Sequence, residues 1–158
     1  NFHFDMVRVG LCMYGYKPSQ YQMNLNLKPV MSLKSKVSFI RIIDNEVGVS
    51  YGRNFITSKK TKLAVISIGY ADGIYRTLSN KISLLHNGKM YPQIGAITMD
   101  QLMIDVTGAN DINVGDTVIL LGCDEGKCIS PVDWAHAAST IPWEILCAFK
   151  NRLPRVQI

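Results

Sequence analysis

Hydrophobic and polar residues alternate through the middle of the chain in short runs that are typical of β-strands. The stretch 33–43 has apolar residues on one alternation, which predicts a strand with one face turned inward. The run 62–68 (KLAVISI) is apolar and has the length of a fully buried strand. Between them, a polar turn at 44–46 precedes another stretch, 47–51, that is expected to be extended.

A hairpin is predicted in the second half of the chain. Asn-Gly at 87–88 separates the stretches 82–86 and 89–94, and both turn residues tolerate a positive φ angle. Further strands are expected at 101–106 and 116–121, with turn residues between them. The total of seven or eight strands predicts a mainly β fold, either a twisted barrel or a sandwich.

Helical signals occur only near the end of the chain. Ser130 offers an N-cap hydroxyl, and Pro131 suits the first helical position. The apolar face of this short helix would consist of Trp134, Ala137 and Ala138. A second short helix is expected after residue 140, with Pro142 in its first turn.

The amino-terminal segment differs from the rest. Residues 6–14 (MVRVGLCMY) are mostly apolar and predict a buried strand, in which Arg8 would need a partner because an unpaired buried guanidinium is very costly. Residues 20–32 resemble an irregular connection. We therefore divide the chain into residues 1–32 and a β domain at 33–158.

Composition narrows the class of protein. The chain has 158 residues, of which 47% are hydrophobic and 18% charged, a balance typical of a folded domain. Its 17 basic and 12 acidic residues give a net charge of +5. The densest basic cluster, at 59–62, is better explained by a solvated turn than by a nucleic-acid site, so no nucleic-acid partner is expected.

The four cysteines do not follow the pattern of a secreted disulfide scaffold, so a reducing compartment and a cytoplasmic location are expected. Cys123 and Cys128 flank a predicted hairpin loop, but no second ligand pair has zinc-site spacing, so no metal is expected. No apolar run approaches the roughly 20 residues of a membrane span. The start has neither a methionine nor a basic leader, which suggests a piece of a longer polypeptide.

Five segments together resemble the carboxy-terminal signatures of alanine racemases. They are MVRVGLCMYG at 6–15, VGVSYGRNF at 47–55, ISIGYADGIYR at 66–76, IGAITMDQLMIDV at 94–106 and TIPWEILCAFKNRLPRV at 140–156. The resemblance implies that 33–158 is the carboxy-terminal β-barrel-like domain of such an enzyme. Residues 1–32 would be the last strand of an otherwise absent cofactor-binding (β/α)8 barrel and its connection.

The family interconverts L- and D-alanine by two-base proton transfer with pyridoxal phosphate, and supplies D-alanine for peptidoglycan. The cofactor is held by a lysine of the barrel that this chain does not contain, so residues 1–158 alone are expected to be inactive. In the family the enzyme is a homodimer, in which the tyrosine domain of one chain closes over its partner's barrel. Tyr51 and Arg8 would then serve different active sites.

The resemblance also implies four cofactor-binding residues. Arg8 matches the arginine that donates a hydrogen bond to the pyridine nitrogen, which would keep that nitrogen unprotonated and suppress side reactions. Gly10 and Leu11 match backbone positions near the cofactor phosphate. Trp143 departs from the family pattern, which has a tyrosine whose hydroxyl reaches the phosphate, whereas an indole offers one N–H donor.

Tyr51 matches the catalytic tyrosine, which is opposite the lysine across the substrate α-carbon and needs nearby positive charge to act as a base at neutral pH. Tyr70 and Arg76 match positions that line the substrate entrance. Met99 matches the residue whose backbone amide meets the substrate carboxylate, and Asp100 follows it in the same site-lining segment.

Two other functions remain open. One is a serine or broad-specificity amino-acid racemase, which the substitution at Trp143 keeps in consideration. The other is a non-catalytic β-barrel module that binds an acidic partner through its lysines, in which Tyr51 and Arg8 would be ordinary surface residues.

Overall fold

The structure, a computed structural model that describes residues 4–18 and 24–157, is built on a sheet of seven antiparallel strands. The strands are β1 (Leu33–Ile43), β2 (Thr61–Ile66), β3 (Ser83–His86), β4 (Lys89–Ile94), β5 (Leu102–Asp105), β6 (Thr117–Asp124) and β7 (Lys127–Ile129). Two α-helices follow, α1 (Pro131–Ala138) and α2 (Pro142–Ala148). Four short 3-10 helices are η1 (Gly10–Tyr14), η2 (Tyr51–Arg53), η3 (Tyr70–Asp72) and η4 (Arg76–Leu78).

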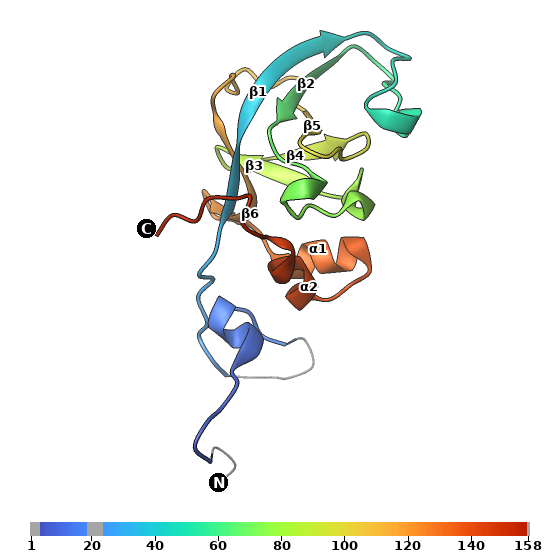
Figure 1. Cartoon of the computed structure of the whole chain (residues 1–158). Coiled ribbons are helices and arrows are strands. Elements are labelled where there is room, and N and C mark those ends of the chain that lie inside the picture. Colours follow the sequence, from blue (N-terminus) through green and yellow to red (C-terminus); the bar gives the residue numbers. More distant parts are fainter. Residues whose placement is uncertain (1–3, 19–23, 158) are drawn as a thin grey trace.

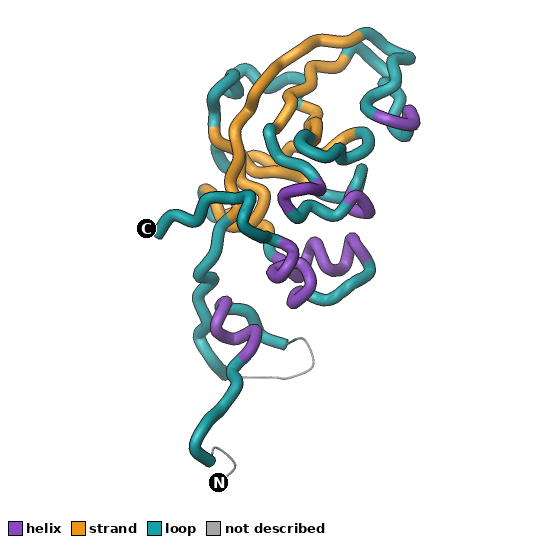
Figure 2. Tube along the Cα trace, viewed as in Figure 1, coloured by secondary structure: helices purple, strands orange, loops and turns teal. Residues whose placement is uncertain are grey.

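The strands close into a ring, which confirms the predicted mainly β, barrel-like fold. Their order is β1-β2-β5-β4-β3-β6-β7, and β1 also pairs with β6 (Figures 1 and 2). The length of β1 makes this closure possible, because its first residues pair with β6 and its later residues pair with β2. The register shifts between Val37 and Phe39, so an irregularity lies where β1 changes partner.

Most of the predicted strands are present. The predicted stretches 33–43, 62–68, 82–86, 89–94, 101–106 and 116–121 correspond to β1 through β6, and Asn87-Gly88 joins β3 to β4. The extended stretch at 47–51 is largely wrong. Gly48 forms one isolated bridge to Ile56, and Tyr51 begins η2. Ser50 has a φ of 62°, which a strand cannot accommodate.

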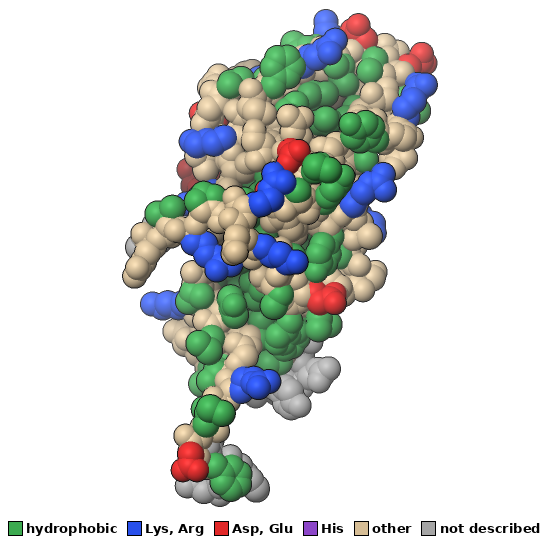
Figure 3. All heavy atoms as spheres, viewed as in Figure 1, with side chains coloured by type: hydrophobic (Ala, Val, Ile, Leu, Met, Phe, Trp, Pro, Cys, Tyr) green, Lys and Arg blue, Asp and Glu red, His purple; other side chains and the backbone are tan. Residues whose placement is uncertain are grey.

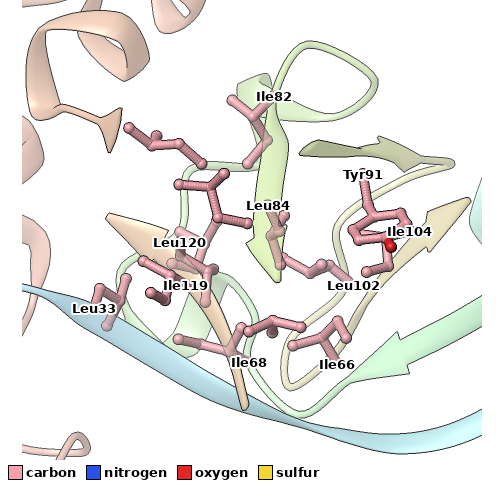
Figure 4. Close-up of a cluster of buried hydrophobic side chains, with 14 of the residues drawn as sticks. Leu33, Ile66, Ile68, Ile82, Leu84, Tyr91, Leu102, Ile104, Ile119 and Leu120 are labelled. Carbon is pink, nitrogen blue, oxygen red and sulfur yellow. The ribbon is translucent and has the colours of Figure 1, made fainter. Parts of the chain in front are cut away.

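The core lies inside the ring of strands. Ile66, Leu84, Leu102, Ile104 and Leu120 come from four different strands and are 0% exposed. Figure 4 shows these side chains gathered in one cluster. Each such burial contributes roughly 1.5–3 kcal/mol, which is the main free-energy source for closing the ring.

The two helices begin where the sequence predicted. Ser130 and Asp133 form a capping box, in which the Asp133 N–H donates to Ser130 Oγ at 3.2 Å and the Ser130 N–H donates to Asp133 Oδ2 at 2.7 Å. Trp134 is buried and tilts against Phe149, while Ala137 and Ala138 are half-buried against the same core. Helix α1 therefore packs onto the core through the predicted face.

The predicted buried strand at residues 6–14 is wrong. Residues 4–10 are exposed, Gly10–Tyr14 forms η1, and Leu11 is the one buried residue of the segment 6–14. No described strand runs beside this segment, so an extended backbone there would lack ladder partners. The segment instead folds back on the connection, where the Val30 N–H donates to the Tyr14 carbonyl at 3.3 Å.

Two cysteines are paired, which differs from the expectation of a reducing compartment. Cys123 and Cys128 form a disulfide across the β6–β7 hairpin. They are directly opposed, with Cα atoms 4.0 Å apart, and close approach of this kind occurs at non-hydrogen-bonded pairs of antiparallel strands. A hairpin loop was predicted between these cysteines, but the register that places them opposite each other was not.

No helix among the described residues combines the length and the apolar character that crossing a membrane requires.

Candidate functional site

A cavity of about 570 Å³ lies between the amino-terminal segment and helix α2. We call it the Arg8–Trp143 cavity. It brings together all four predicted cofactor-binding residues: Arg8, Gly10 and Leu11 are close in the sequence, and Trp143 joins them from the other end of the chain. Its lining consists of Met6, Val7, Arg8, Val9, Gly10, Leu11, Met13, Tyr14, Trp143, Leu146 and Cys147.

The walls of this cavity offer several kinds of contact to a small ligand. Arg8 is exposed and brings a permanent positive charge. Gly10 has a φ of +66°, and no atom lies within 4 Å of where its Cβ would be, so the backbone there stays open to an approaching group. Trp143 is 39% exposed and presents an aromatic surface with one N–H donor. The cavity thus suits an anionic ligand with a flat ring.

Apolar residues frame the same cavity. Several large hydrophobic side chains of the amino-terminal segment and of α2 are exposed, and Figure 3 shows hydrophobic side chains gathered over the lower part of the molecule. They are Met6, Val7, Val9, Met13, Tyr14 and Trp143. A group of exposed apolar side chains marks a surface that another molecule or segment covers.

A second cavity, of about 810 Å³, lies on the other side of α2. Tyr70 and Arg76, the two residues predicted at a substrate entrance, both line it. Cys147 of α2 borders this cavity and the Arg8–Trp143 cavity. Tyr75 also lines it and donates from its hydroxyl to the Glu144 carbonyl at 3.1 Å. Burial, with Glu144 nearby, raises the pKa of Tyr75, which keeps this phenol neutral.

Tyr70 and Met99 belong to two loops that are bonded to each other. The Tyr70 N–H donates to the Thr98 carbonyl at 2.9 Å, and the Ala71 N–H donates to the Met99 carbonyl at 3.0 Å. A Cβ on Gly69 would lie 2.2 Å from the Thr98 carbonyl oxygen, so the close approach requires glycine. The structure therefore joins two predicted substrate residues in one rigid unit.

Tyr51 lies apart from both cavities, in η2 at the tip of an excursion between β1 and β2. Its side chain is 73% exposed. The excursion is anchored by Ser50, whose Oγ donates to the Ala96 carbonyl at 2.7 Å, and by the buried Thr57, whose Oγ1 donates to the Asp44 carbonyl at 2.7 Å. In Figure 1 the teal helix η2 and the blue amino-terminal segment lie at opposite ends of the molecule.

Some residues of these loops were not anticipated. Asp100 was predicted to line the site, and its carboxylate pairs with Arg152, which also reaches Asp72. Neither Asp72 nor Arg152 was predicted as a site residue. A pairing between residues so far apart leaves no local signal in a single sequence. The anchoring role of Ser50 was missed for the same reason.

Comparison with known proteins gives one consistent family. Residues 30–157 match the family model described as alanine racemase, C-terminal domain. An alanine racemase of Prochlorococcus marinus is 54% identical over 157 residues, which are 99% of this chain and 41% of that protein. An alanine racemase of Nostoc is 50% identical, with the same coverage. The chain thus spans about two fifths of the length of these relatives.

Solved structures agree with the sequence comparison. The alanine racemase of E. faecalis has a TM-score of 0.88 at 33% identity, over 95% of this chain and 40% of that one. The alanine racemase of Bartonella henselae with covalently bound pyridoxal phosphate has a TM-score of 0.88 at 37% identity, over 99% and 43%. That of Bacillus anthracis with bound L-Ala-P has a TM-score of 0.83 at 34% identity, over 89% and 36%.

Proposed function

This chain belongs to the family of alanine racemase carboxy-terminal domains, and we propose that, as part of a longer polypeptide, it takes part in the interconversion of L- and D-alanine. Residues 33–158 would be the domain that carries the catalytic tyrosine. Residues 1–32 would belong to the end of the cofactor-binding barrel and its connection. The relatives are named alanine racemases, and the proposal assigns this chain a part in the same reaction.

The observation that carries the proposal is the convergence of Arg8, Gly10, Leu11 and Trp143 on one cavity. Their residue types fit pyridoxal phosphate, which the Bartonella henselae relative holds covalently. Arg8 would face the ring nitrogen, while the open backbone at Gly10 and Leu11 and the Trp143 N–H would face the phosphate. When bound, pyridoxal phosphate supplies an electron sink for the carbanion that forms when the α-proton leaves.

Arg8 would tune that chemistry through its charge. A guanidinium only donates hydrogen bonds and keeps its protons near neutral pH. It would therefore leave the ring nitrogen without a proton and limit how much negative charge enters the ring. The exposure of Arg8 supports this role, because its charge needs no partner within the chain.

Tyr51 would transfer a proton at one face of the substrate α-carbon. Racemisation needs a proton-transferring group on each face, since the proton leaves from one side and returns from the other. Tyr51 lies at the end of the molecule opposite the segment that carries Arg8, so both cannot reach one substrate within a single chain. We therefore infer a homodimer, in which Tyr51 of each chain reaches into the site of its partner.

The substrate would be held by the unit that joins Tyr70 to Met99. The Met99 carbonyl accepts a hydrogen bond from the Ala71 N–H. The Met99 N–H has no backbone partner among the described residues. That N–H would donate to the substrate carboxylate. Tyr70 and Arg76 would line the path by which alanine enters, because both border the 810 Å³ cavity.

The product D-alanine would supply peptidoglycan, and a cytoplasmic location would suit that supply. In a reducing compartment the exposed Cys123–Cys128 disulfide would form only transiently, since such compartments keep most thiols reduced.

The proposal is tested with the complete polypeptide and pyridoxal phosphate. Turnover of L-alanine and L-serine would be followed by circular dichroism, and α-proton exchange by NMR in deuterated water. We expect both enantiomers of alanine to racemise with deuterium incorporation, and L-serine to react much more slowly. Comparable rates with L-serine would favour the broad-specificity racemase, and no exchange with any amino acid would favour the non-catalytic binding module.

A further inference from the structure

Arg152 connects the chain after α2 to two loops at once. Its Nε lies 3.1 Å from Asp72 Oδ1, and its Nη2 donates to Asp100 Oδ1 at 2.6 Å. Asp72 belongs to η3, and Asp100 directly follows Met99. One guanidinium therefore bridges two carboxylates from segments that are separate in the sequence.

Asp72 links Arg152 to the loop that carries Tyr70. Its side chain is 9% exposed, and its Oδ2 accepts the Gly69 N–H at 2.9 Å, which closes the turn of η3. A carboxylate with so little access to water requires a charged partner, and Arg152 is the cation that reaches it. Without Arg152, the charge of Asp72 would draw water into the turn and loosen it.

The second carboxylate, Asp100, links Arg152 to the segment that carries Met99. Asp100 is exposed, so its ion pair alone would contribute little to stability. The Asp100–Arg152 pair instead fixes geometry, because the planar guanidinium fork of Arg152 sets the direction of each bond that it makes. Together with the bonds from Tyr70 to Thr98 and from Ala71 to Met99, the fork holds both loops in one orientation.

We propose that Arg152 is a positioning residue for the substrate carboxylate, which it affects by orienting the Met99 N–H and the Tyr70 side chain. The inference rests on the proposed function. Arg152 itself touches neither substrate nor cofactor in this scheme. Since small displacements of an orienting group weaken binding strongly, loss of the fork should act mainly on the affinity for carboxylate-bearing ligands.

The experiment uses the complete polypeptide with pyridoxal phosphate and compares Arg152→Gln, Arg152→Lys and Asp100→Asn. We expect Arg152→Gln to raise the KM for L-alanine about tenfold while kcat changes less than about threefold. The inhibition constant of propionate, a carboxylate without the amino group, should rise by the same factor. Arg152→Lys should restore only part of the affinity, because an ammonium cannot form the planar fork.

Arg155→Gln is the matched control. Arg155 is another arginine of the same end of the chain, and it donates to the Phe149 carbonyl at 3.1 Å. This variant should keep the KM of the wild type. Asp100→Asn removes the negative charge from one arm of the fork but keeps an oxygen that can accept from Arg152, and the position is exposed, so the variant should fold normally and shift KM and the propionate constant in the same direction by a smaller factor.

The outcomes separate the two proposals. An active wild type, together with unchanged KM and propionate constants in Arg152→Gln and Asp100→Asn, would overturn the positioning role alone. The same holds if Arg152→Gln loses cofactor or thermal stability while Asp100→Asn keeps both constants, because the role would then be structural. A wild-type polypeptide that exchanges no α-proton would overturn the proposed function and this inference with it.

Discussion

Arg8 and Trp143 border the same cavity although they lie near opposite ends of the chain. The cavity exists because the segment before β1 lies beside α2 and does not continue as a strand. Neither the amino-terminal segment nor the β domain would form this cavity alone. A ligand bound there would therefore stabilise the packing of one against the other, by a free energy that grows with the logarithm of its concentration relative to its dissociation constant.

Helix α2 is the wall shared by this cavity and the neighbouring one. Trp143 faces the first, Glu144 faces the second, and Cys147 borders both. A displacement of α2 would change both cavities together, since a helix of two turns moves as a unit. One helix therefore borders both the proposed cofactor site and the proposed substrate entrance.

The first prediction concerns Tyr51. Tyr51→Phe in the complete polypeptide should lower kcat by at least about 10²-fold, because a positioned acid or base contributes about 10²–10⁴-fold. The loss should differ between L- and D-alanine, since the phenol would serve one face of the α-carbon. Racemisation followed from each enantiomer by circular dichroism checks this.

The matched control for Tyr51 is Ile56→Ala, in the same excursion. Ile56 is exposed and pairs with Gly48 through backbone atoms, so the excursion should keep its shape. Its kcat should stay within about threefold of the wild type by the usual size of surface substitutions. Equal losses in both variants would mean that the excursion matters as a whole and that the phenol has no special role.

The second prediction concerns the core. Leu120→Ala should lower the free energy of unfolding by about 2–5 kcal/mol, because a fully buried leucine leaves a cavity when truncated. Val114→Ala, at a 59% exposed position, should change it by less than about 0.5 kcal/mol. Urea unfolding of the complete polypeptide measures both. A small effect at Leu120 would show that the ring of strands repacks around the gap.

The third prediction concerns the disulfide. Cys123→Ser with Cys128→Ser should lower the free energy of unfolding by about 2 kcal/mol, the scale expected for a short closed loop. Dithiothreitol should lower the wild type to the same value and leave the double variant unchanged. If the reductant destabilises both proteins equally, its effect does not arise from Cys123 and Cys128.

The sequence predicted the strands well because their signals are local. Alternation over 33–43 and Asn-Gly at 87–88 each depend on a few neighbouring residues, and both predictions are confirmed. The segment 6–14 was predicted wrongly because an apolar run indicates burial without saying what covers it. Ser50 was missed because the partner of its side chain, the Ala96 carbonyl, is 46 residues away in the sequence.

The candidate site likewise combines residues that the sequence predicted with contacts that it could not predict. The cofactor-binding roles of Arg8 and Trp143 could be proposed from the family resemblance. Only the fold shows that both residues line one cavity. The ion pairs of Arg152 with Asp72 and Asp100 connect segments far apart in the sequence, and a single sequence carries no pattern for such contacts. Pairings of this kind depend on the closed ring of strands and on the packing of α2, which follow from the whole core.

The last prediction concerns Trp143, which lies where the family resemblance led us to expect a tyrosine. If its indole N–H donates to the cofactor phosphate, Trp143→Phe should weaken pyridoxal phosphate binding by about 10-fold or more, because a hydrogen bond to a charged group contributes about 1.5–3 kcal/mol. Trp143→Tyr should restore the affinity, since a phenol hydroxyl can donate to the same group. Absorbance titration with pyridoxal phosphate measures the three affinities.

Val156, exposed and outside the cavity, offers the control Val156→Ala, which should bind like the wild type. Equal binding by Trp143→Phe and the wild type would mean that the ring of Trp143 matters only for the shape of the cavity, and the phosphate contact would then have to come from the backbone at Gly10 and Leu11.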